Sequence, residues 1–294
     1  MSIPFEGLYT AIVTPFTQTG EIDKEAYKKH IEYQLSNEVS GLVICGTTGE
    51  SPSITDAEFE YLITAAREIC GDAYPIIAGT GTNSTQKSIH RSKQAQDLKA
   101  DALLIVSPYY NKPTQQGIND HYVSIADAVD IPLMIYNVPG RTSVNILPGT
   151  VAQMAEHPNI AGIKEASGNM QQIMATIQSV PDDFPVLSGD DAMTLPLIAA
   201  GGKGLVSVAG NEAPGLMSNY VQACLAGNMQ RARKLHYRLL PLMKANFWQS
   251  NPIPVKAALS YMGRMQNSLR LPMVPLENKF EAELKQILRN LDLL

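Results

Sequence analysis

Residues Asn159–Glu165 read NIAGIKE and carry the strongest single indication of the fold. The run from Ile160 to Ile163 is short and apolar, which predicts a buried strand with Lys164 at its end. A charged amine in that position is costly unless it is paired or has lost its proton. A lysine desolvated in this way is a nucleophile toward carbonyl compounds at neutral pH. The alternative is a lysine that forms an ion pair at the strand end, for example with Glu165.

Seven similar runs lie elsewhere in the chain, so that eight strands are predicted: Leu8–Val13, Gly41–Ile44, Pro75–Ala78, Ala102–Val106, Pro132–Tyr136, Ile160–Lys164, Pro185–Leu187 and Gly204–Val208. Stretches with helical periodicity separate them: Lys24–Ser36, Asp56–Cys70, Ser84–Lys99, Gly117–Ala128, Leu147–Glu156, Asn169–Val180, Ala192–Ala200 and Pro214–Ala226. Eight strand–helix alternations predict an α/β fold, an eight-stranded parallel β/α (TIM) barrel. The rival is a doubly wound open sheet, which usually has fewer strands and a clearer nucleotide-binding loop.

The pattern changes after the eighth strand. Three more helices are predicted with no strand between them, Met229–Trp248, Pro254–Met262 and Leu276–Leu293, and the prolines of residues 249–254 separate the first two. We therefore expect residues 1–225 to form the barrel domain and residues 226–294 a C-terminal helical extension packed on it.

Composition narrows the classes of function. The chain has 294 residues, 45% of them hydrophobic, and a formal net charge of −5. It contains no dense Lys/Arg run of the kind expected of a nucleic-acid-binding protein and no apolar stretch near the length of a membrane span. Its three cysteines and five histidines show no disulfide framework or metal-ligand spacing. With no signal-peptide pattern at the N-terminus, we expect a cytoplasmic protein.

In β/α barrels the site lies where the strands end. Thr47 and Thr48 follow the second strand between glycines and are suited to hold a carboxylate, although a plain glycine-rich turn has the same pattern. Tyr136 ends the fifth strand and is placed to shuttle protons, unless it is a core tyrosine. Arg141 follows it and is suited to clamp a carboxylate, although a lone arginine is more often a solvated loop residue. Their occurrence with Lys164 on one rim favours chemistry.

Two other patterns on this rim carry less weight. The turn Gly79–Asn83 fits neither a P-loop nor a dinucleotide fingerprint. Asp190 and Asp191 are a candidate for a divalent cation, but carboxylates at a helix N-terminus are the commoner explanation.

Six segments in order resemble the dihydrodipicolinate synthase family, within the wider pyruvate-dependent class I aldolases. They are AIVTPF (11–16), GTTGES (46–51), SPYYNKP (107–113), YNVPGRT (136–142), IKEASGN (163–169) and SGDDA (188–192), and the resemblance extends from about residue 7 to 215.

The resemblance implies a Schiff-base mechanism without cofactor. Lys164 would attack the keto carbon of pyruvate, and the resulting enamine would attack the aldehyde of L-aspartate-4-semialdehyde to give 4-hydroxy-tetrahydrodipicolinate, on the route to diaminopimelate and lysine. Tyr136, Thr47 and Tyr110 would form a proton relay.

The resemblance also implies binding roles and an assembly. Thr48 would bind the pyruvate carboxylate and Arg141 that of the semialdehyde, while Gly189 and Val206 would line the site through their carbonyl groups. Tyr110 would come from the neighbouring subunit of a homotetramer built as a dimer of dimers.

The sequence departs from lysine-inhibited members of this family, in which a histidine and a glutamate line an allosteric pocket. The matching residues here are Phe59 and Lys87, with Asp56 at a second histidine position, whereas Asn83 and Tyr109 remain. A cation at Lys87 would repel L-lysine. We expect weak or absent inhibition, and a submillimolar inhibition constant would refute this. A further departure, Glu212, stands where an apolar residue is more usual and has no explanation at this level.

Two rival functions remain. A sister aldolase, such as N-acetylneuraminate lyase or a keto-deoxy sugar acid aldolase, would share Lys164, Tyr136 and the GTTGE-like loop. Arg141 and the Tyr109–Tyr110 pair argue against it, because an extended sugar acid needs hydroxyl partners. A non-catalytic metabolite-binding barrel is the other rival, and the intact set of candidate catalytic residues argues against that.

Overall fold

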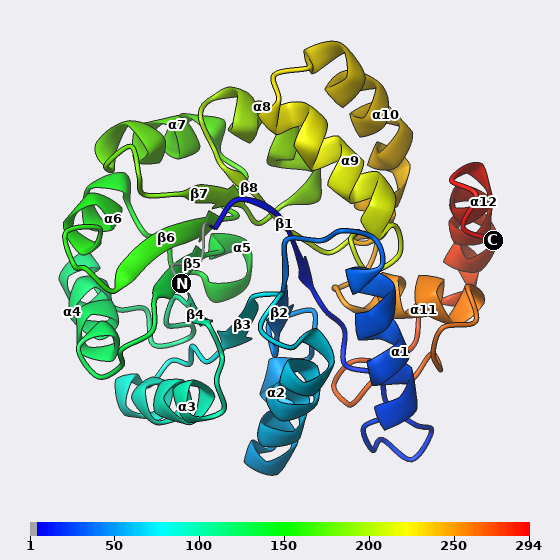
Figure 1. Ribbon diagram of the computed structural model, residues 1–294, viewed down its shortest axis with the longest axis horizontal. Helices are drawn as coiled ribbons and strands as arrows, with labels where there is room; N and C mark the ends of the chain where they lie inside the picture. Colours follow the sequence, from blue (N-terminus) through cyan, green and yellow to red (C-terminus); the bar gives the residue numbers. More distant parts are fainter. Residues whose placement is uncertain (1–4) are drawn as a thin grey trace.

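The computed structural model describes residues 5–294 and forms a closed barrel of eight parallel strands with helices around it (Figure 1). The strands are β1 (Gly7–Ala11), β2 (Gly41–Ile44), β3 (Ile76–Gly79), β4 (Ala102–Val106), β5 (Leu133–Asn137), β6 (Ile160–Glu165), β7 (Val186–Ser188) and β8 (Gly204–Ser207). Strand β8 pairs with β1, which closes the sheet. The predicted barrel is confirmed, and the open doubly wound sheet is wrong.

Strands β1 and β8 end earlier than predicted because side-chain oxygens, rather than a neighbouring strand, accept the hydrogen bonds of the next backbone N–H groups. Strand β1 stops at Ala11, since the N–H of Val13 donates to Oδ1 of Asn211 at 3.0 Å instead of to a neighbouring strand. Strand β8 stops at Ser207, since the N–H of Val208 donates to Oδ2 of Asp191 at 3.0 Å. At this end, the predicted strand was two residues too long for β1 and one residue too long for β8.

Helices follow the strands around the ring: α1 (Lys24–Leu35), α2 (Asp56–Cys70), α3 (Thr85–Asp97), α4 (Gln115–Ala126), α5 (Pro139–Thr142), α6 (Pro148–Met154), α7 (Met170–Ser179), α8 (Thr194–Ala199) and α9 (Pro214–Leu225). Helix α2 begins with a capping box, in which Thr55 and Glu58 satisfy each other's backbone N–H. It buries one face, including Leu62 and Ala66. The short helix α5 was not predicted.

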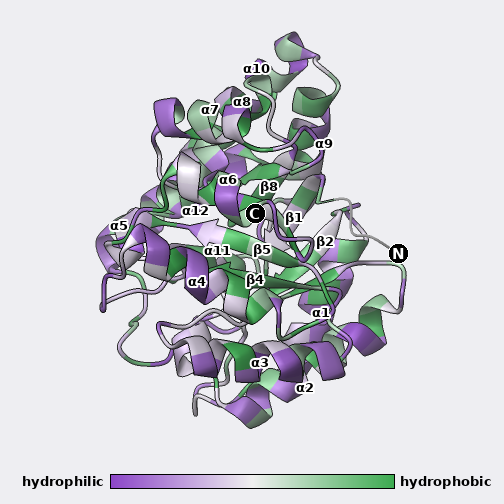
Figure 2. Cartoon of the chain, turned by 90° about the vertical axis from the view of Figure 1, so that its left-hand side faces the viewer, coloured by the Kyte–Doolittle hydropathy of each residue, from purple (hydrophilic) through white to green (hydrophobic). Residues whose placement is uncertain are grey.

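The core has two layers because side chains alternate along each strand. On β4, Ala102 and Leu104 point into the barrel, whereas Leu103 and Ile105 pack under the helices. Figure 2 shows mostly hydrophobic strands inside a shell of helices that alternate between hydrophobic and hydrophilic faces. On β6, Ile163 belongs to the outer layer, so the next residue, Lys164, points into the barrel.

Helices α10 (Met229–Ala245), α11 (Ile253–Tyr261) and α12 (Glu281–Asn290) follow the barrel and lie to its right in Figure 1. Val255 and Leu259 of α11 pack with Val13 and Val208, which follow β1 and β8, so α11 covers the carboxyl ends of those strands. The predicted last helix was too long, since residues 278–280 form a separate 3₁₀ turn before α12. None of the helices between residues 5 and 294 is long and apolar enough to cross a membrane.

Candidate active site

Lys164 lies in the upper part of the barrel interior and is 6% exposed. Its register partner on β5 is Tyr136, and its Nζ lies 4.2 Å from the centre of the Tyr136 ring. The neighbouring Gly189 makes room for the lysine stem: a Cβ there would lie 2.9 Å from Cε of Lys164 and 2.8 Å from Cβ of Ala166. A side chain at residue 189 would therefore displace the amine.

The ion pair proposed as the alternative for Lys164 does not form. Among residues 5–294, Lys164 takes part in none of the ion pairs, and the carboxylate of Glu165 is engaged elsewhere. Glu165 accepts from Nδ2 of Asn137 at 3.0 Å and from the N–H of Ser167 at 2.6 Å. These bonds join the ends of β5 and β6 and leave the lysine side chain free on the inner face.

The loop Gly46–Ser51 brings Thr47 and Thr48 to the same place. Both ends of this loop are strained, since Cys45 and Glu50 have positive φ angles of 55° and 56°. Thr48 is 2% exposed, and its Oγ1 accepts from Nδ2 of Asn251 at 2.9 Å. Because such backbone conformations persist only where the surroundings enforce them, the contacts of Glu50 decide how this loop is held.

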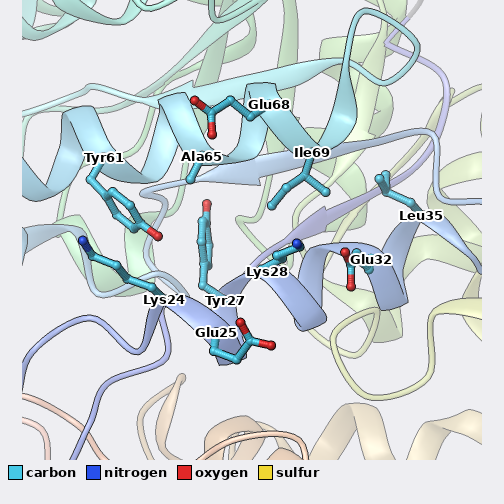
Figure 3. A pocket seen from close by; sticks show the side chains of 10 residues that line it. All are labelled: Lys24, Glu25, Tyr27, Lys28, Glu32, Leu35, Tyr61, Ala65, Glu68 and Ile69. Atoms are coloured by element: carbon cyan, nitrogen blue, oxygen red, sulfur yellow. The ribbon is translucent and has the colours of Figure 1, made fainter.

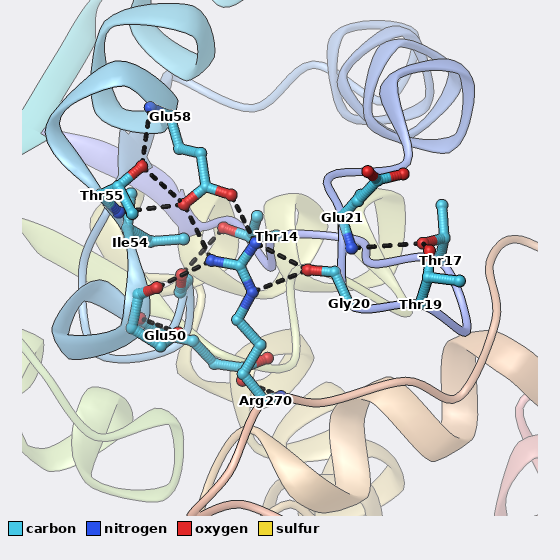
Figure 4. Close-up of polar contacts among 12 residues, drawn as sticks. Thr14, Thr17, Thr19, Gly20, Glu21, Glu50, Ile54, Thr55, Glu58 and Arg270 are labelled. Atoms are coloured by element: carbon cyan, nitrogen blue, oxygen red, sulfur yellow. Dashed lines mark hydrogen bonds and ion pairs between the residues drawn. The ribbon is translucent and has the colours of Figure 1, made fainter.

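Glu50 is held by the C-terminal segment. Its Oε1 lies 2.5 Å from Nζ of Lys256, which is fully buried in α11, and its Oε2 accepts from the N–H of Arg270 at 3.1 Å. Burial lowers the pKa of Lys256 to about 8, opposed by the Glu50 carboxylate, so the amine is charged at neutral pH. Figure 4 shows the Arg270 guanidinium reaching on to Glu58 and to the carbonyl group of Gly20.

Arg141, on α5, stands at the mouth of the site. Its Nη2 donates to the backbone oxygen of Asn251 at 3.2 Å. It borders two adjoining cavities: an inner one of about 110 Å³ that reaches Lys164, Tyr136 and Thr48, and an outer one of about 220 Å³ that reaches Tyr109. Thr47 borders both. Six of the eight predicted residues thus surround one small cavity: Thr47, Thr48, Tyr136, Arg141, Lys164 and Gly189.

The structure places the other two predicted residues differently. Tyr110 is 89% exposed on the loop after β4 and borders neither cavity. Val206, on β8, lies in the apolar layer inside the barrel, and Val208 borders the inner cavity instead.

Asn251 and Phe247 also border the inner cavity, and the sequence interpretation missed both. They come from the segment between α10 and α11, where the only signal was the prolines that separate two helices.

Asp190 and Asp191, near β8, have structural partners. Asp190 caps the short 3₁₀ turn that follows β7, its Oδ1 accepting from the N–H of Ala192 at 2.9 Å. Asp191 accepts from Ser207 and from two backbone N–H groups, and burial raises its pKa to about 6. Glu212 is fully buried, which raises its pKa well above the usual value. In the described part of the chain, no three His, Cys, Asp or Glu residues are grouped to hold a metal ion.

Two further regions lie away from Lys164. A hollow of about 720 Å³ lies between α1 and α2 on the outer surface and is lined by side chains of both charges, such as Lys24 and Glu68 (Figure 3). None of the predicted site residues lines it. Phe59, on α2, is fully buried beneath the guanidinium of Arg91, whose centre lies 5.1 Å from the ring, while Lys87 is exposed on α3.

Comparison with known proteins places this geometry in a family. The chain is 50% identical over 294 residues to the 4-hydroxy-tetrahydrodipicolinate synthase of Thermotoga neapolitana, with 99% of this chain and all of that protein covered. The crystal structure of dihydrodipicolinate synthase from Thermotoga maritima is 46% identical, with a TM-score of 0.97 over 99% of this chain and 100% of that one.

A second solved structure, the chloride-inhibited dihydrodipicolinate synthase from Acinetobacter baumannii complexed with pyruvate, is 40% identical, with a TM-score of 0.97 over 98% of this chain and 99% of that chain. Residues 4–291 match the dihydrodipicolinate synthetase family. Because the family match covers nearly the whole chain and the relatives are similar along its whole length, the protein belongs to the dihydrodipicolinate synthetase family.

Proposed function

We propose that this protein is a lyase that condenses pyruvate with L-aspartate-4-semialdehyde to 4-hydroxy-tetrahydrodipicolinate, a step of diaminopimelate and lysine biosynthesis. Lys164 attacks the keto carbon of pyruvate, and loss of water leaves a cationic imine. The imine draws electrons from the methyl group, which loses a proton to give an enamine. The enamine carbon then bonds to the aldehyde carbon, and the substrate's own amine displaces Lys164 as the ring closes.

The inner cavity supports a role for each neighbouring side chain. Tyr136, whose ring lies against the amine, moves protons to and from the reacting atoms together with Thr47 and Tyr110. Thr48 binds the pyruvate carboxylate, and Arg141, at the mouth, binds the carboxylate of the semialdehyde. Gly189 leaves space for the lysine stem, and with Val206 it would offer a backbone carbonyl group to the site.

The proposal includes an assembly. Tyr110 is too exposed to serve the site of its own chain, so it serves the site of a neighbouring copy, within a homotetramer built as a dimer of dimers. Residues 1–225 form the catalytic barrel and residues 226–294 the extension that braces it. A cytoplasmic location, no cofactor and no nucleic-acid partner remain part of the proposal.

One observation carries the proposal: a buried lysine without an ion-pair partner among residues 5–294 lies against a tyrosine ring at the floor of a cavity whose mouth holds an arginine. Borohydride added with pyruvate should therefore leave one reduced pyruvate on Lys164, seen by mass spectrometry of the peptide. Lys164→Ala should fold normally and lose at least about 10³-fold in turnover. Normal activity in that variant would rule out the covalent mechanism.

A second experiment separates this activity from that of a sister aldolase. The purified protein is given pyruvate with either L-aspartate-4-semialdehyde or N-acetylmannosamine, and the product is identified by its mass. We expect product only from the semialdehyde, because Arg141 offers a carboxylate clamp where a sugar acid needs hydroxyl partners. Condensation of N-acetylmannosamine alone would overturn the assignment of substrate.

A further inference from the structure

Asn251 is a buried polar residue in the inner cavity that the mechanism above does not use. It lies between α10 and α11, is 3% exposed and borders the cavity with Lys164. Its Nδ2 donates to Oγ1 of Thr48 at 2.9 Å, and its backbone oxygen accepts from Arg141 at 3.2 Å. Asn251 therefore connects the two groups proposed to bind the two substrate carboxylates.

One polar atom of Asn251 is left without a partner. Its Oδ1 is buried and accepts no hydrogen bond from any described residue. The orientation of the amide follows from its neighbour: if the Thr48 hydroxyl donates to a carboxylate, it accepts from Asn251, which places Nδ2 on the Thr48 side. Because buried acceptors in folded proteins are nearly always satisfied, the unpaired Oδ1 of a residue that borders the substrate cavity calls for a donor on the ligand.

The two proposed substrates differ in what they can donate. Pyruvate offers a carboxylate, a carbonyl group and a methyl group, and so has no hydrogen-bond donor. The semialdehyde carries an α-amino group on the carbon next to its carboxylate. If Arg141 holds that carboxylate, the amino group on the adjacent carbon lies close to Asn251, because Arg141 contacts the backbone oxygen of that residue.

We propose that Oδ1 of Asn251 accepts a hydrogen bond from the α-amino group of the aldehyde substrate and makes the site selective for an amino-bearing aldehyde. The inference rests on the proposed function and adds a specificity-determining residue to it. A site built to bond a substrate N–H rejects an analogue without it, because the site's own polar group is then left buried and unpaired. The segment between α10 and α11 thus recognises the second substrate.

The test compares L-aspartate-4-semialdehyde with succinic semialdehyde, which has the same chain without the amino group. In the presence of pyruvate, the wild-type protein should bind succinic semialdehyde, measured as an inhibitor, at least about 10-fold more weakly than L-aspartate-4-semialdehyde. In Asn251→Leu, which is similar in size but has no acceptor, KM for L-aspartate-4-semialdehyde should rise by about 10-fold to 100-fold. The inhibition constant of succinic semialdehyde should change by less than about 3-fold.

Thr48→Val is the matched control, because it removes the partner of Nδ2 while keeping Oδ1. It should weaken pyruvate binding and retain the preference for the amino-bearing aldehyde. An Asn251→Leu variant that loses affinity for both aldehydes equally would overturn the inference. So would a wild-type protein that binds both equally, and this second comparison decides the matter even if the variant does not fold.

Failure of the proposed function gives a different result. In that case the wild-type protein forms no product from pyruvate and L-aspartate-4-semialdehyde, and borohydride traps no pyruvate on Lys164. Normal turnover by the wild-type protein without an amine-dependent effect of Asn251→Leu would leave the proposed function standing and remove only the role of Asn251.

Discussion

At the scale of single residues, Glu212 is a side chain whose pKa the fold changes, and this change should be detectable as a dependence of stability on pH. It is fully buried, and burial raises its pKa well above the usual value, which the neighbouring Asn246 amide only partly offsets. A buried acid with a raised pKa keeps its proton at a pH where the unfolded chain has released it. Folding therefore takes up a proton, and stability falls as pH rises from the unfolded-state pKa toward the folded-state pKa.

Replacing Glu212 tests whether this residue makes stability depend on pH. The Glu212→Gln substitution introduces a neutral side chain of the same shape, so it removes the titration without opening a cavity. We expect the variant and the wild type to be similarly stable near about pH 5. As pH increases, the free energy of unfolding of the variant should rise relative to that of the wild type by up to about 1.4 kcal/mol per pH unit. The free energy of unfolding in urea at several pH values gives this difference.

An exposed acid supplies the control for Glu212. Glu25 lies on α1 with its side chain 71% exposed, in an i,i+4 pair with Lys29. Glu25→Gln should change stability by a small amount that varies little across the same pH range. A flat difference between Glu212→Gln and the wild type would show that Glu212 is ionised in the folded protein.

At the scale of elements, helix α11 and the loop after it hold the strained loop that carries Thr47 and Thr48. Lys256 and Glu50 form an ion pair with side chains 0% and 3% exposed. Removing one partner of such a pair leaves an uncompensated buried charge, which costs about 3–5 kcal/mol. Lys256→Met should therefore lower the free energy of unfolding by about that amount and raise KM for pyruvate, because the loop that carries Thr48 loses its ion pair with α11.

Two further variants separate charge from packing. The double variant Lys256→Met, Glu50→Gln removes both charges and should recover part of the lost stability. Arg238→Met breaks the exposed pair with Asp292 and should cost less than about 1 kcal/mol. Equal losses in all three variants, measured by urea unfolding, would contradict the claim that burial makes the Lys256 pair important.

The elements also show which parts of the structure could be predicted from the sequence. Short apolar runs predicted all eight strands, because a strand that is buried on both faces, inside the barrel and under the helices, is apolar along its length. The sequence pattern placed Lys164 and Tyr136 on one face because they end neighbouring parallel strands. It missed Asn251, since nothing local indicates that a break between two helices returns to the barrel mouth. Nor did it predict α5, whose four residues are too few to show periodicity.

At the scale of the whole molecule, the exposed Tyr110 bears on assembly. Its side chain is 89% exposed, while the adjacent Tyr109 borders the outer cavity next to Thr47 and Arg141. A two-fold symmetric pair of subunits that meet at this edge would bring each Tyr110 to the other's site. Every site would then use Lys164 from one chain and Tyr110 from its partner.

Two inactive variants should therefore restore each other. Tyr110→Phe and Lys164→Ala each damage every site of their own dimer, but a mixed dimer holds one site with both native residues. After unfolding and refolding an equal mixture, about a quarter of wild-type turnover should return if subunits pair at random. Mixing the two variants without refolding should restore little if the subunits exchange slowly. A tyrosine that acts within its own chain cannot be supplied by a partner. If mixed dimers are shown to form and turnover does not return, then Tyr110 either acts in the site of its own chain or takes no part in the chemistry.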